Sequence, residues 1–180
     1  MGHVERAARA SKAFGSGVPA NLAVAVGWYA QAAAQGLPEA QYELGLAYLK
    51  GAGIDADADL AADWLTLAAA GGLVAAQYTL GTLYMEGIGV PRDYFAAVEW
   101  FFRAANQGNR DAQYHVGVMY AEGMGVMRQE AKAEQWLRKA AAGGHELARR
   151  ELATLQQRRV RALGNYPLPD LRRVRADSFG

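Results

Sequence analysis

Apolar side chains recur every three to four residues between positions 75 and 110, which is the spacing of one face of an α-helix. The spacing holds in two segments, 76–84 and 97–105. Gly87 and Gly89 separate the segments, and glycine readily adopts the left-handed backbone found where helices end. Asp93 then stands where an N-cap residue would begin the second helix, and Asn21, Asp57 and the poorer cap Gln129 are its counterparts in the other units. The pattern predicts two helices joined by a short loop, which packs them antiparallel.

The same pattern returns along the chain in steps of 36 residues, without an insertion. Tryptophans, glycine pairs and Gln-Tyr motifs all keep this step. These positions are Trp28, Trp64, Trp100 and Trp136; Gly15/Gly17, Gly51/Gly53, Gly87/Gly89 and Gly123/Gly125; and Gln41, Gln77 and Gln113. A fixed period of roughly 20–50 residues is the signature of repeat proteins. The sequence therefore predicts an all-α fold of stacked helix–turn–helix units.

Four motifs recur in this frame: Gln-Tyr-x-Leu-Gly-x-x-Tyr, Gly-x-Gly-Val-Pro, Ala-x-x-Trp and Ala-Ala-x-x-Gly. Together they resemble the Sel1-like repeat, a relative of the tetratricopeptide repeat. The resemblance implies a right-handed α-solenoid whose concave face is lined mainly by the first helix of each repeat. It also implies an adaptor or scaffold role in protein assemblies, often in bacteria.

The frame divides the chain into units with altered ends. We expect repeats at 3–38, 39–74, 75–110 and 111–146, a capping helix at 147–163 and a tail at 164–180. In the first repeat, Glu5, Arg6 and Arg9 replace the Gln-Tyr and glycine positions, which indicates a solvent-facing cap. Near the other end, Arg159 and Arg161 replace the glycine pair, so the last helix is expected to run on to about Leu163.

Charge is unevenly distributed along a chain whose net charge is +1. The stretch 39–134 carries a net charge of −7, whereas eight arginines fall between Arg149 and Arg175. No signal peptide is predicted, because the first residues lack an apolar core. No membrane span is predicted either, because the longest apolar stretch, 22–34, contains Gly27 and Gln31 and coincides with a repeat helix. We expect a soluble monomer, and the cytoplasm and the periplasm both stay open.

The reactive side chains of this sequence favour a non-enzymatic protein without metal or cofactor. The chain has no cysteine. Its histidines, His3, His115 and His145, share no ligand spacing, and His115 is predicted to be a surface residue. No serine stands in a nucleophile–base arrangement. We therefore predict no catalytic, cofactor-binding or metal-binding residue.

A partner is expected on the exposed side of the first helices, in the concave groove. The residues predicted to bind it are Tyr42, Leu46, Leu49, Tyr78, Thr82, Met85, Glu86, Tyr114, Val118, Glu122 and Arg150. The sets Leu46/Thr82/Val118 and Leu49/Met85/Ala121 differ between repeats, so they are the better candidates for specificity. The tyrosines recur in register, and packing between repeats is an alternative role for them.

The function predicted from these observations is a scaffold that binds a protein or peptide in its groove. Nearby acidic residues favour a partly apolar, basic segment. An alternative is that the arginine-rich end binds nucleic acid, an anionic membrane surface or an acidic partner. A weaker third alternative is an enzyme or a cell-wall-processing accessory.

Overall fold

The computed structural model describes residues 22–164, and the expected N-terminal cap and the tail beyond Gly164 lie outside this range. The described residues form helices only, with no strand among them. The helices are α2 (Leu22–Ala33), α3 (Pro38–Lys50), α4 (Ala58–Ala70), α5 (Val74–Glu86), α6 (Tyr94–Asn106), α7 (Arg110–Glu122), α8 (Glu130–Ala142) and α9 (Glu146–Gly164).

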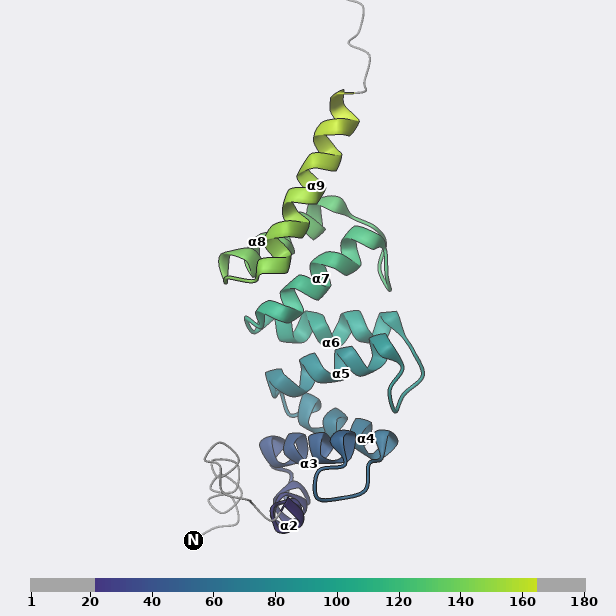
Figure 1. The fold of residues 1–180 in the computed structure, drawn as a ribbon, viewed down its shortest axis with the longest axis vertical. Coiled ribbons are helices and arrows are strands. Elements are labelled where there is room, and N and C mark those ends of the chain that lie inside the picture. The colour runs from purple at the N-terminus through teal and green to yellow at the C-terminus, as the bar shows by residue number, and fades with distance from the viewer. Residues whose placement is uncertain (1–21, 165–180) are drawn as a thin grey trace, which may run out of the picture.

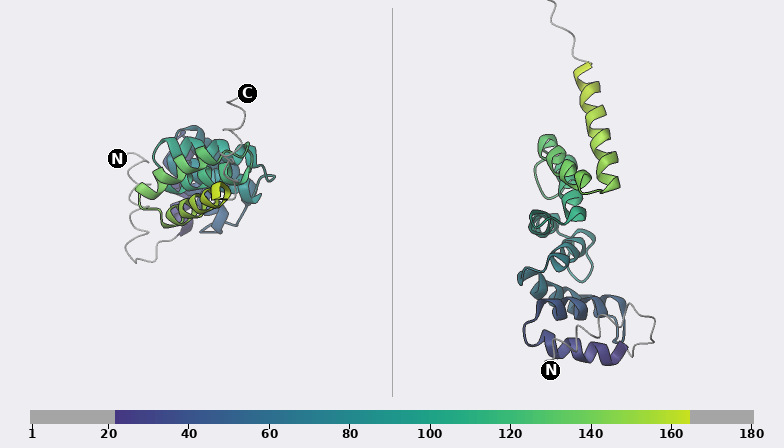
Figure 2. Two further views of the ribbon diagram at one scale, coloured as in Figure 1. Left: turned by 90° about the horizontal axis from the view of Figure 1, so that it is seen from above. Right: turned by 90° about the vertical axis from the view of Figure 1, so that its left-hand side faces the viewer.

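The helices stack in chain order along one long axis, from α2 at one end to α9 at the other (Figure 1). Contacts run between successive helices, and α7 also touches α9 directly. In Figure 1 and in the right-hand view of Figure 2, α9 projects beyond the end of the stack. This arrangement confirms the predicted all-α solenoid. We call α3, α5, α7 and α9 the A helices and α2, α4, α6 and α8 the B helices.

The core consists of four apolar clusters, each centred on a B helix and the A helix that follows it. Tryptophans join neighbouring clusters: Trp64 of α4 packs against the α2–α3 cluster, and Trp100 of α6 packs against the α4–α5 cluster. Trp136 of α8 belongs to the α6–α7 cluster and is 8% exposed. The tryptophan series therefore holds repeats together.

Close approach of the helices explains one glycine series. A Cβ atom on Gly81 of α5 would lie 2.7 Å from the ring of Phe101 on α6, which is fully buried. Gly45 and Gly117 meet Leu65 and Leu137 in the same way. A side chain at these positions would push each A helix away from its B helix.

Helix ends follow the caps that the sequence predicts. Asp57 accepts a hydrogen bond from the backbone N–H of Leu60, and Asp93 accepts from that of Ala96. Gln129, the poorer cap, makes no such side-chain bond. The predicted cap Asn21 lies outside the described residues.

Candidate partner-binding surface

The A helices α5, α7 and α9 touch one another, and we call the surface formed by the A helices the A-helix face. The rings of Tyr78 on α5 and His115 on α7 have centroids 5.9 Å apart. Further along, Glu122 of α7 and Arg158 of α9 form an ion pair of 3.6 Å. These contacts bring together residues that are 36 or 37 positions apart in the chain.

All eleven residues predicted to bind a partner lie on the A helices. The half-buried ones are Tyr42, Leu46, Leu49, Tyr78, Thr82, Met85, Tyr114 and Val118, and the exposed ones are Glu86, Glu122 and Arg150. The surface thus combines partly exposed apolar and aromatic side chains with fully exposed charges. Ala121, named with the variable set, is buried at 1% exposure, because the helix turns that residue toward α8 and α9.

The tyrosines of the A helices pack between repeats. Tyr42 of α3 packs against the α4–α5 cluster, Tyr78 of α5 against the α6–α7 cluster, and Tyr114 of α7 against the α8–α9 cluster. Packing between repeats, which the sequence offered as an alternative role for these tyrosines, is therefore observed. Each ring is still only half-buried, so part of it remains on the surface.

His115 corrects the prediction of a surface side chain. It is half-buried and stacks on Phe101, with ring centroids 4.7 Å apart and planes at 8°. Burial lowers the pKa of His115, the carboxylate of Asp111 raises it in part, and His145 lowers it further. Glu43 and Thr79 occupy the equivalent position in the earlier repeats and are also half-buried. Polar character at this position therefore does not indicate exposure.

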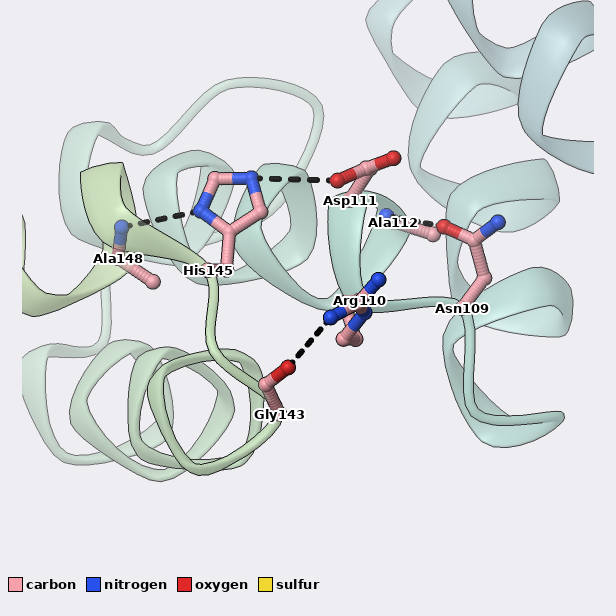
Figure 3. Close-up of polar contacts among 7 residues, drawn as sticks. All are labelled: Asn109, Arg110, Asp111, Ala112, Gly143, His145 and Ala148. Carbon is pink, nitrogen blue, oxygen red and sulfur yellow. Dashed lines mark hydrogen bonds and ion pairs between the residues drawn. The ribbon is translucent and has the colours of Figure 1, made fainter.

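A polar junction fastens α9 to α7 (Figure 3). His145 Nδ1 accepts a hydrogen bond from the backbone N–H of Ala148, and its Nε2 lies 3.4 Å from Asp111 Oδ1. Beside it, Arg110 donates to the backbone oxygen of Gly143 at 2.6 Å. The His145 ring also stacks on Tyr114, with centroids 4.6 Å apart. The junction fixes where the last A helix continues the face.

The electrostatic environment of Tyr78 is negative. Its pKa is raised first by burial, then by the charge of Asp111, and also by the charge of Glu86, while a hydrogen bond with Thr82 opposes the shift. Both carboxylates belong to exposed residues on the A helices. A cationic group placed over this half-buried ring would be attracted by the carboxylates and by the ring itself.

A cavity of about 190 Å³ lies between α2 and α3, at the N-terminal end of the described solenoid. Leu46, one of the predicted binding residues, contributes to its wall with Val26. Glu43 and Lys50 also line it. Burial raises the pKa of Glu43, and the charge of Lys50 partly offsets this effect. Leu46 therefore lies beside a cavity at the N-terminal end of the described solenoid, whereas its counterparts Thr82 and Val118 lie in later repeats.

The glutamines of the Gln-Tyr motif have a role that the sequence reasoning missed. Gln41, Gln77 and Gln113 each donate from Nε2 to a backbone oxygen near the end of the preceding B helix, at 3.3, 3.2 and 3.1 Å. The acceptors are Ala33, Ala69 and Ala105. Recurrence in register was the available signal, and the hydrogen bonds show that the recurrence of these glutamines is structural.

Within residues 22–164, no group of three or more His, Cys, Asp or Glu side chains could hold a metal ion. None of the described helices combines the length and the apolar character needed to cross a membrane.

The repeated helix pairs, stacked in chain order, define a class of protein, the α-solenoids. Within that class, the Sel1 repeat model matches residues 5–37, 38–73, 74–109 and 110–145. The chain therefore belongs to the Sel1 repeat family, which confirms the resemblance seen in its sequence. Sel1 repeat proteins generally mediate protein–protein interactions and are generally non-catalytic scaffolds.

Solved structures agree with this assignment. The protective antigen c5321 of uropathogenic Escherichia coli, which displays an SLR fold, is 42% identical over 85% of this chain, with a TM-score of 0.79. A Sel1 repeat protein from Oxalobacter formigenes is 44% identical over 73% of the chain, with a TM-score of 0.69. This chain covers 32% and 38% of those two proteins.

Helicobacter pylori cysteine rich protein B shares the fold at 22% identity, with a TM-score of 0.57. The match covers 73% of this chain and 96% of that protein. Among curated proteins, none matches this chain.

Proposed function

We propose that this protein is a non-enzymatic scaffold that binds a partner protein or peptide on its A-helix face. The observation that carries the proposal is the combination found around Tyr78. A half-buried ring lies in the field of two exposed carboxylate residues, Glu86 and Asp111, and half-buried Met85 and Val118 are on the same helices. Partly exposed apolar groups provide contact area, and carboxylates select the sign of the partner's charge.

The partner's chemistry follows from this surface. An extended segment with apolar side chains and intervening lysines or arginines would place its apolar groups on Tyr78, Met85 and Val118. Its cations would face Glu86 and Asp111. Burying one apolar side chain contributes roughly 1.5–3 kcal/mol. A charge-assisted hydrogen bond contributes roughly 1.5–3 kcal/mol more.

Charge reversal at Glu86 tests the proposal with little risk to the fold. Glu86 is the last residue of α5, where a cation is favoured by the helix dipole. Asp63 of α4 is a matched control, because it is an exposed carboxylate on a B helix. The full chain and both variants, Glu86→Lys and Asp63→Lys, would be used to capture partners from the source organism's lysate. The captured partner would then be titrated calorimetrically.

We expect Glu86→Lys to lower the affinity for the partner at least about tenfold, which corresponds to a loss of roughly 1.4 kcal/mol of binding free energy. Asp63→Lys should leave the affinity unchanged. Met85→Asp and Val118→Asp are less suitable, because both side chains pack against the core and their loss would also destabilise the fold. Equal affinities for the two charge-reversed variants would show that the partner binds elsewhere.

The alternative function, binding of an anionic partner by the arginine-rich end, rests on the five exposed arginines of α9. Three of them already pair with carboxylates of this protein: Arg149 with Glu146, Arg158 with Glu122, and Arg159 with Glu134. These pairs reduce the charge left for an external anion. Binding that is lost at about 0.5 M salt and is unaffected by Glu86→Lys would favour this alternative.

A further inference from the structure

His145 makes two polar contacts of different kinds, one through each ring nitrogen (Figure 3). Nδ1 accepts a hydrogen bond from the backbone N–H of Ala148, in the first turn of α9, at 3.1 Å. Nε2 faces Asp111 Oδ1 of α7 at 3.4 Å. A neutral imidazole that accepts at Nδ1 carries its proton at Nε2. The contacts therefore correspond to the neutral ring, which caps α9 and turns its N–H toward Asp111.

The repeat frame shows what is unusual about this cap. Asn109, 36 residues earlier in the chain, stands before α7 and accepts from the backbone N–H of Ala112 at 2.8 Å. The amide oxygen of an asparagine accepts whatever the pH. An imidazole accepts only while it is neutral, and histidine is the side chain whose charge ordinarily changes between about pH 5 and 8. The chain thus has a pH-sensitive cap where the preceding repeat has a pH-insensitive one.

A proton added to His145 must go to Nδ1, because Nε2 already carries one. Nδ1 then becomes a donor and can no longer accept from the N–H of Ala148. The new charge also lies at a helix N-terminus, where the helix dipole disfavours cations. On the other side of the ring, the contact with Asp111 becomes a charge-assisted one between opposite charges. One proton therefore weakens the link to α9 and strengthens the link to α7.

We propose that His145 is a pH-operated clasp between α7 and α9. The neutral ring caps α9 and leaves Asp111 with its full negative charge on the A-helix face. The protonated ring releases the first turn of α9 and neutralises Asp111. The inference rests on the proposed function in one respect, because Asp111 is one of the two carboxylates proposed to face the partner's cations. Affinity for such a partner then falls as the pH falls.

The groups around the ring allow this exchange. The side chain of Asp111 is 60% exposed and open to a partner, whereas that of His145 is 14% exposed and held by stacking on Tyr114. Burial and the charge of His145 both lower the pKa of His115, so a charged His145 favours the neutral form of His115. Other charged groups on the packed elements have contacts of their own: Arg110 with the backbone oxygen of Gly143, Glu146 with Arg149, and Lys139 with the ring of Trp136.

The effect of the clasp is local. Loss of an N-cap destabilises the folded chain, and gain of an ion pair stabilises it, so the two changes oppose each other in the free energy of unfolding. The melting temperature is therefore a poor measure of the clasp. The direct measures are the protonation state of the His145 ring and the protection of the Ala148 amide.

Nuclear magnetic resonance of the full chain between about pH 7.5 and about pH 5 tests the proposal. Proton–nitrogen spectra of the ring give its tautomer and its titration. Hydrogen exchange of the Ala148 amide, corrected for the intrinsic effect of pH, gives the state of the cap. The variants are His145→Asn, which keeps a cap of the Asn109 type, and Asp111→Asn, which removes the partner of the charged ring.

We expect the unmodified chain to carry its ring proton at Nε2 at the upper pH. As the ring titrates, protection of the Ala148 amide should fall roughly fivefold, the factor that an N-cap worth about 1 kcal/mol gives. In His145→Asn this protection should not change with pH. In Asp111→Asn the fall should occur at lower pH, because the charged ring has lost its stabilising partner.

Three results would overturn the proposal. They are a neutral ring protonated at Nδ1, a ring that titrates while the Ala148 amide stays protected, and a midpoint that Asp111→Asn leaves unmoved. The first two come from the unmodified chain, so they decide the question even if a variant does not fold.

A synthetic peptide of alternating leucine and arginine probes the consequence for the A-helix face. Between about pH 7.5 and about pH 5.5, its affinity should fall by up to about fivefold for the unmodified chain and stay constant for His145→Asn. Equal affinities at both pH values for the unmodified chain would overturn the link between the clasp and the face. A peptide that binds at neither pH would contradict the proposed function, whereas the clasp itself is decided by the resonance measurements, so the two failures are distinguishable.

Discussion

Gln77 is a buried side chain that joins three segments of the solenoid. Its Nε2 donates to the backbone oxygen of Ala69 at the end of α4, and its Oε1 accepts from Gln107 Nε2 at 2.8 Å, just after α6. Gln113 makes the equivalent bond to Ala105. A buried polar group that loses its hydrogen-bond partner is costly, which explains why an apolar core keeps a glutamine at this position.

Replacing these two glutamines should therefore have unequal effects. We expect Gln77→Ala to lower the free energy of unfolding by about 1–3 kcal/mol, because it removes two hydrogen bonds worth roughly 0.5–1.5 kcal/mol each, whereas the oxygen of Ala69 keeps its bond from the backbone N–H of Gly72. Gln113→Ala should cost less, since Gln113 is only partly buried. Urea unfolding of the two variants measures the difference. A larger loss for Gln113→Ala would contradict this account.

His115 should make stability depend on pH. Its pKa in the folded state is below the usual value of 6.5, because burial against Phe101 disfavours the charged ring. The unfolded chain then binds more protons, so stability is complete above about pH 6.5 and is lost as the pH falls toward the folded-state pKa. His115→Phe, which keeps an aromatic ring on Phe101, should flatten this dependence. Thermal unfolding of both proteins between pH 7.5 and 5 measures it, and an NMR-determined pKa above 6.5 would contradict it.

Gly81 decides how closely two helices pack. A methyl group there would lie 2.7 Å from the ring of fully buried Phe101, so α5 and α6 would have to separate. Gly27 on α2 is the opposite case, since a Cβ atom there would have nothing within 4 Å. The two glycines have the same helical context and differ in what faces them.

Alanine substitutions should consequently have opposite signs. Gly81→Ala should destabilise the protein by about 1–3 kcal/mol through overpacking. Gly27→Ala should stabilise it by up to about 1 kcal/mol, because alanine is the better helix former. The midpoints of urea unfolding give the comparison. If both variants were stabilised, the tight α5–α6 contact would be refuted.

The repeat pattern predicts elements well and side-chain roles less well. Helices, glycine turns and the caps Asp57 and Asp93 were predictable, because each depends on local backbone chemistry that recurs in register. The half-buried position of His115 was not, because it depends on Phe101 from another helix. The packing of Tyr78 on the next repeat could be stated only as an alternative, since a residue that recurs for packing and one that recurs for binding leave the same pattern.

The molecule as a whole is an elongated stack in which each repeat contacts mainly its neighbours (Figures 1 and 2). Such a stack exposes several long faces. Apolar groups also lie elsewhere on the surface, such as Phe95 on α6, which is 75% exposed. The central claim is that the A-helix face, and not a B-helix surface of this kind, meets the partner.

Site-specific photocrosslinking in the source organism's lysate tests that claim most directly. A photoreactive amino acid would replace Thr82 on the A-helix face in one protein and Phe95 in another. The account predicts a crosslinked adduct of higher mass from position 82, lost when Glu86→Lys is added, and none from position 95. An adduct from position 95 with none from position 82 would contradict it.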